Sequence, residues 1–157
     1  MTRRPPRYLF MGIVAGAVSS VFVVILSYLA GVFVIALVMP DRSQEALLAV
    51  LLAAVTVLPL MLLIVVLPTT LLIGITAGFL LGLGSRLRGR PLGPSAGALA
   101  GLALSELVFS VALPLVAPPK PSGDFVSIVS NPYLCAAYGL TLGSTAGLIF
   151  RRLIRAE

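Results

Sequence analysis

The chain has 157 residues, of which 59% are hydrophobic and only 10% are charged. Soluble domains carry roughly 25% charged residues, so this composition excludes a soluble fold. The net charge of +6 comes from arginines that flank apolar segments, which favours membrane-topology signals over binding to nucleic acid. We therefore expect an integral membrane protein with one transmembrane domain over residues 1–157, in contact with the lipid bilayer.

The first apolar run predicts a helix over residues 8–39. Basic residues precede it, as in a secretory signal peptide, but the run is about twice as long as the apolar part of such a peptide. The only Ala-x-Ala match nearby, Ala15–Ala17, comes too early in the chain to be a cleavage site. We therefore expect this first helix to be retained.

Three more helices are expected, over residues 42–84, 94–116 and 132–154. Pro59 and Pro68 interrupt the second run and predict kinks there, because proline lacks the backbone N–H that the preceding turn needs. The expected fold is an all-α integral membrane four-helix bundle. Its first two helices are longer than the others.

Basic residues indicate how these helices are oriented. Nine of the eleven lie in three clusters: Arg3, Arg4, Arg7, Arg86, Arg88, Arg90, Arg151, Arg152 and Arg155. Four crossings with both termini in the cytoplasm place every cluster inside, in agreement with the positive-inside rule. A fifth crossing, made by splitting the second run at Pro68, would place the middle cluster outside, so we reject it. The arginines also suit contacts with anionic lipid headgroups.

Each expected helix carries small residues four positions apart. These glycine ladders are Gly12 and Gly16; Gly74, Gly78 and Gly82; Gly93, Gly97 and Gly101; and Gly139, Gly143 and Gly147. A spacing of four places them on one face of a helix, where small residues let helix backbones approach closely. The pattern predicts tight packing at the cytoplasmic end of the bundle. A glycine-lined conduction path is the alternative.

The first two apolar runs are longer than the approximately 20 residues that a crossing requires. The surplus falls at residues 31–39 and 46–58, at the outer end, and tilt absorbs only part of it. The segment 46–58 either lies in the membrane interface, folds back into the bilayer or packs on another protein. A large apolar surface is typical of a contact site, so other membrane subunits or self-association are expected as partners.

Glu106 is the one acid inside a long apolar segment, about midway along the third helix. An ionised side chain at that depth costs about 2.5–3.5 kcal/mol on insertion scales, and no Lys, Arg or His lies in any apolar segment to pair with it. It is therefore protonated, hydrogen-bonded, bound to a cation or paired with a different chain. Ser110 shares its helix face, and Pro114 leaves the carbonyl of Ser110 without a donor. The candidate intramembrane polar site consists of Glu106, Ser110, Ser105, Tyr138 and Tyr28.

Motifs for catalysis are absent from the sequence. It has no histidine and one cysteine, Cys135, and it contains no phosphate-binding loop, nucleophile elbow or zinc motif. We therefore expect no enzyme activity, cofactor or metal. Two functional hypotheses remain, of which the first is a non-catalytic accessory subunit of a larger membrane complex. The alternative is a small oligomeric transporter or channel with Glu106 as its proton or cation site. Arginine-, alanine- and glycine-rich composition is typical of a GC-rich bacterial genome, which suggests the inner (plasma) membrane.

Overall fold

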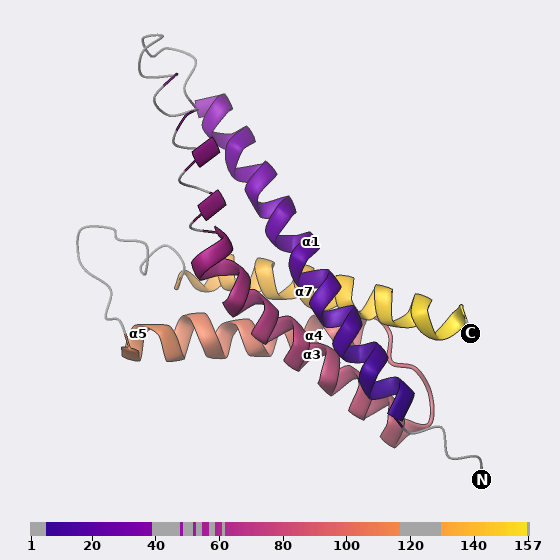
Figure 1. The fold of residues 1–157 in the computed structure, drawn as a ribbon. Helices are drawn as coiled ribbons and strands as arrows, with labels where there is room; N and C mark the ends of the chain where they lie inside the picture. Colours follow the sequence, from indigo (N-terminus) through magenta and orange to yellow (C-terminus); the bar gives the residue numbers. More distant parts are fainter. Residues whose placement is uncertain are drawn as a thin grey trace.

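The computed structural model describes residues 6–38, 48, 52, 55–56, 59–60, 62–116 and 130–156, and all regular structure in them is helical. The elements, labelled as in Figure 1 with η for a π-helix, are α1 (Pro6–Val38), η1 (Leu62–Val66), α3 (Leu67–Arg88), α4 (Pro94–Ser105), η2 (Glu106–Ala112), α5 (Leu113–Val116) and α7 (Pro132–Arg155). Four stretches of the described part are long and apolar enough to cross a membrane: Arg7–Phe33, Leu67–Arg88, Pro94–Leu115 and Pro132–Arg155. The predicted all-helical class and the four spans are confirmed.

Local residues explain where these helices begin and end. Pro94 and Pro132 each occupy the first turn of a helix, where their missing N–H groups have no intrahelical partner to lose. The Asn131 side chain accepts a hydrogen bond from the Tyr133 backbone N–H at 3.0 Å and so caps α7. Gly89 ends α3 with φ of 67°, a left-handed conformation that suits glycine. This is why α3 continues to Arg88 rather than ending at the expected residue 84.

Two helix pairs are built by backbone contact. In the first pair, α1 packs against α3, and a Cβ atom at Gly12 or Gly16 would overlap the carbonyl oxygen of Gly78 or Gly74 respectively. In the second pair, α4 packs against α7, and a Cβ atom at Gly97 would overlap the carbonyl oxygen of Gly143. Only residues without a side chain permit so close an approach. Gly93 is different, because a Cβ there would meet nothing within 4 Å.

A serine adds an interhelical hydrogen bond to each pair. The Ser20 hydroxyl donates to the Thr70 backbone carbonyl at 2.9 Å, and the Ser105 hydroxyl donates to the Cys135 backbone carbonyl, also at 2.9 Å. Both serines are fully buried. Each pair is therefore joined by glycine contacts along its length and by a serine hydrogen bond beyond them.

The two pairs repeat one pattern. Small residues recur in the same order and spacing, so that Gly12, Gly16 and Ser20 of α1 correspond to Gly97, Gly101 and Ser105 of α4, while Gly74, Gly78 and Gly82 of α3 correspond to Gly139, Gly143 and Gly147 of α7. Contacts between pairs repeat too, since α1 lies against α7 and α3 lies against α4. In Figure 1, α1 and α3 run diagonally together, and α4 and α7 cross them. The described fold is one helix pair used twice.

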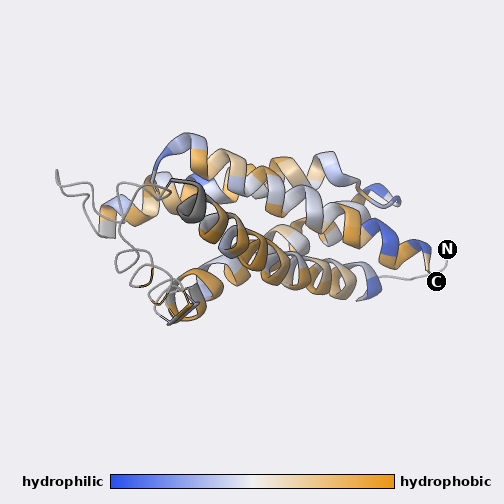
Figure 2. Ribbon diagram, turned by 90° about the horizontal axis from the view of Figure 1, so that it is seen from above, coloured by the Kyte–Doolittle hydropathy of each residue, from blue (hydrophilic) through white to orange (hydrophobic). Residues whose placement is uncertain are grey.

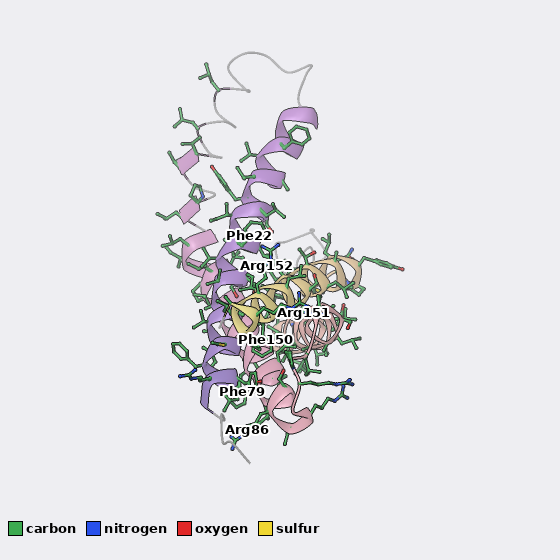
Figure 3. All side chains as sticks on the ribbon, turned by 90° about the vertical axis from the view of Figure 1, so that its right-hand side faces the viewer. Phe22, Phe79, Arg86, Phe150, Arg151 and Arg152 are labelled. Atoms are coloured by element: carbon green, nitrogen blue, oxygen red, sulfur yellow. The ribbon has the colours of Figure 1, made fainter. Side chains whose placement is uncertain are left out.

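Side chains fill the space between the two pairs. Val23, Ile73 and Leu142 are buried there, and partly buried residues of the second pair surround them: Leu104, Val108, Phe109 and Tyr138. Near the end of α7, Phe150 is fully buried, whereas Phe22 and Phe79 on the first pair are exposed (Figure 3). Contact within a pair is thus made by backbone, and contact between pairs is made by larger side chains.

Prolines coincide with both π-helical segments. Pro68 lies just after η1, and Pro114 lies just after η2. Proline cannot donate to the carbonyl one turn back, and its ring excludes that carbonyl. Instead, the Leu113 N–H bonds to the Val108 carbonyl, five residues back. The third span is therefore not the single α-helix expected over residues 94–116, but α4, η2 and α5 in succession.

The surplus apolar segment 46–58 lies mostly outside the described residues. Of that segment the structure describes four helical residues, and the aliphatic ones, Leu48, Leu52 and Val55, are all more than 60% exposed. Pro59 has a helical backbone conformation. The surplus of the first run belongs to α1, which continues as a helix to Val38.

Candidate functional site

Glu106 is the first residue of η2, immediately after the ladder face of α4 ends at Ser105. The Ser110 hydroxyl donates a hydrogen bond to Oε2 of Glu106 at 2.7 Å. Both side chains are partly buried. The structure thus brings together the two residues that their spacing placed on one helix face.

Cys135 of α7 joins this pair across the helix interface. Its thiol lies close to the side chains of Ser110 and Glu106. Cys135 is 2% exposed, and its backbone carbonyl is the group that accepts from Ser105. We call Glu106, Ser110 and Cys135 the acid cluster. Sequence reasoning missed Cys135, because its place in the cluster depends on how α7 packs against η2.

The Tyr138 hydroxyl has a hydrogen-bond partner on another helix. This hydroxyl is hydrogen-bonded to the Thr70 hydroxyl of α3, and the rings of Tyr138 and Phe109 form a T-shaped pair, with centroids 6.0 Å apart and planes at 82°. Thr70 also donates to the Val66 carbonyl at 2.6 Å. Tyr138 therefore links the two helix pairs, whereas Tyr28 is half-buried on α1 of the first pair.

Arginines gather near both chain ends and the α3–α4 connection. Arg7 begins α1, Arg86 and Arg88 end α3, and Arg90 follows in the connection, all four exposed. The last turns of α7 add three exposed arginines: Arg151, Arg152 and Arg155. Figure 2 shows hydrophilic helix ends beside both termini, and Figure 3 labels Arg86, Arg151 and Arg152. Arg3 and Arg4 lie outside the described residues.

Chemically, the acid cluster offers one carboxyl group, one hydroxyl and one thiol. Within the described ranges, no three His, Cys, Asp or Glu side chains gather as a metal site. Among those same residues, Glu106 has Ser110 as its hydrogen-bond partner and no basic side chain as a counter-charge. The cluster can bind a proton, a cation or a donor from another molecule.

These four apolar spans and the packing of their helices define a multi-pass helical membrane protein. No protein-family model, curated protein or solved structure matches the chain. Its function is therefore inferred from its own surfaces and polar groups.

Proposed function

We propose that the chain is a non-catalytic structural subunit of a larger membrane protein complex. The observation that carries this proposal is the length of α1. Its 33 residues give a helix of about 50 Å, whereas the hydrocarbon core of a bilayer is about 30 Å thick. Fitting all of α1 within this hydrocarbon core would need a tilt of more than about 50°, beyond the roughly 0–40° of membrane helices.

The side chains at this outer end support the same proposal. Phe33 near the end of α1 is 65% exposed, and Leu48, Leu52 and Val55 are comparably exposed. Exposing apolar surface to water costs about 25 cal/mol of free energy per Å². A contiguous apolar surface is typical of an interaction site. A partner subunit that covers this end removes the cost.

We further propose that both termini lie in the cytoplasm, in the inner (plasma) membrane. Arg7, the arginines that end α3 and those that end α7 support this orientation through the positive-inside rule. Reporter fusions test it. A reporter active only in the cytoplasm should work at either terminus, and activity of an exported-only reporter at either terminus contradicts the orientation.

Purification in mild detergent with mass spectrometry tests the subunit proposal. We expect other subunits to co-purify in fixed ratio. Leu52→Ser should reduce their recovery, whereas Leu72→Ser on α3 should not; the two leucines are matched in exposure, at 63% and 64%. Recovery of this chain alone as a homo-oligomer, or equal effects of both substitutions, contradicts the proposal.

The alternative function is a small oligomeric transporter or channel, and the acid cluster favours it. Glu106 and Ser110 lie in a π-helical segment, and such segments are frequent at functional sites. Flux assays in liposomes test this function by comparing wild type with Glu106→Gln. Flux by the purified chain that Glu106→Gln abolishes supports transport, and no flux with any ion tested contradicts it.

A further inference from the structure

The third span is the least covered of the four in the described structure. In its most apolar stretch 11% of residues are buried, against 33% in the first span and 39% in each of the other two. One side of α4 packs on α7 through its glycines. The opposite side is exposed along Leu99, Ala103, Leu107 and Val111. We call these four residues, which follow one another at intervals of four, the open face.

Glu106 lies at the edge of this open face. It directly precedes the exposed Leu107 and lies three residues, a little less than one helical turn, after the exposed Ala103. Glu106 is partly exposed as a residue, beside the open face. A helix that covers the open face would therefore meet Glu106 along one side of its contact.

The carboxyl group has capacity for such a neighbour. A carboxyl group has two oxygens that accept hydrogen bonds, and the Ser110 hydroxyl donates to one of them, Oε2, at 2.7 Å. No basic side chain of the described residues pairs with it. Acids within membrane spans typically pair with other ionisable groups or face a polar cavity. A positively charged donor at the same depth would complement the Glu106 carboxyl group.

We propose that the open face binds a transmembrane helix of a different subunit, which carries one Lys or Arg side chain at the depth of Glu106. This proposal rests on the proposed subunit function. A second copy of this chain does not supply the donor, because none of the eleven basic residues lies within an apolar segment. Lipid tails offer no donor either, so charge complementarity assigns the face to a basic transmembrane helix.

Two synthetic peptides test the proposal directly. Both are polyleucine transmembrane helices, one with a central lysine and one with leucine at that position. The full-length protein is reconstituted into phosphatidylcholine vesicles, and binding of each labelled peptide is followed by energy transfer. We expect the lysine peptide to bind at least tenfold more tightly than the leucine peptide. Equal binding of the two peptides overturns the proposal.

Variants of Glu106 test whether this residue causes the preference for the lysine peptide. Glu106→Gln should remove the difference between peptides, while Glu106→Asp, which keeps the charge, should retain most of it. An unfolding midpoint in sodium dodecyl sulfate equal to that of wild type shows that each variant is folded. Lysine-peptide preference that persists in Glu106→Gln overturns the proposal. Energy transfer between two copies of this chain that depends on Glu106 also overturns it, because the face would then serve self-association.

Native co-purification separates this proposal from the subunit function on which it rests. Subunits that are lost from Glu106→Gln, and whose cross-link to the open face contains a basic transmembrane residue, support both. Subunits recovered equally with wild type and Glu106→Gln leave the subunit function standing and overturn the role of Glu106. Absence of any co-purifying subunit overturns both.

Discussion

Replacement of a ladder glycine by alanine should separate the two helices of its pair. A Cβ atom at position 16 would lie 2.6 Å from the carbonyl carbon of Gly74, and closer still to its oxygen. Ordinary carbon–carbon contacts are about 3.5–4.0 Å, so α1 and α3 must move apart by about 1 Å. That shift would stretch the 2.9 Å bond from Ser20 to the Thr70 carbonyl beyond hydrogen-bonding distance.

The expected loss of unfolding free energy follows from the steric overlap and from the broken hydrogen bond. Overpacking costs about 1–3 kcal/mol, and the lost interhelical hydrogen bond costs about 0.6 kcal/mol. Gly31→Ala is the matched control, because Gly31 lies on the same helix with nothing within 4 Å of its Cβ position. Both substitutions gain the same helix propensity, so their difference isolates the contact. We expect Gly16→Ala to be less stable than Gly31→Ala by about 2–4 kcal/mol.

Unfolding in mixed micelles with increasing sodium dodecyl sulfate measures this difference. Gly101→Ala should behave like Gly16→Ala, because a Cβ there would lie 2.8 Å from the Cα atom of Gly143. Gly93→Ala should behave like the control. If Gly16→Ala and Gly31→Ala unfold at the same midpoint, the two helices are not held by backbone contact, and the reasoning is wrong.

Three further predictions concern buried polar groups. Ser20→Ala and Ser105→Ala should each lower the unfolding free energy by about 0.6–1.7 kcal/mol, and no change in detergent unfolding would contradict their interhelical bonds. Tyr138→Phe and Thr70→Val should show a coupling of about 0.6 kcal/mol in a double-mutant cycle, whereas simple additivity would mean that their hydroxyls do not interact. Cys135 should resist alkylation until the protein unfolds, because it is 2% exposed; rapid labelling in mild detergent would contradict its burial.

Sequence patterns predict what is local along the chain. Long apolar runs indicate the four spans, and the four-residue interval between Glu106 and Ser110 predicts their shared face. Pro114 indicates an irregularity at that point, although the π-helical form of η2 depends on how the surrounding carbonyls rearrange. These features follow from residues within one or two turns of each other.

Contacts between distant segments are harder to predict. Equal ladders on four helices do not indicate which helices pair, and nothing local places Cys135 beside Ser110 or the Tyr138 hydroxyl beside Thr70. The amino-acid sequence does contain one signal for the repeated helix pair. Comparison of the chain with itself would align the ladders of α3 and α7, because each continues four residues later in an arginine, Arg86 or Arg151.

The pairing of α1 with α3 and of α4 with α7 has a consequence for assembly during synthesis. In the described fold, each tight partner is the neighbouring membrane span along the chain. The first pair can therefore form in the bilayer before the third span has left the ribosome, and the second pair can form without rearranging the first. The side-chain core between the pairs and the hydrogen bond from Tyr138 to Thr70 require both pairs to be present. The final step of folding is then the association of two preformed helix pairs, and not the simultaneous packing of four separate helices.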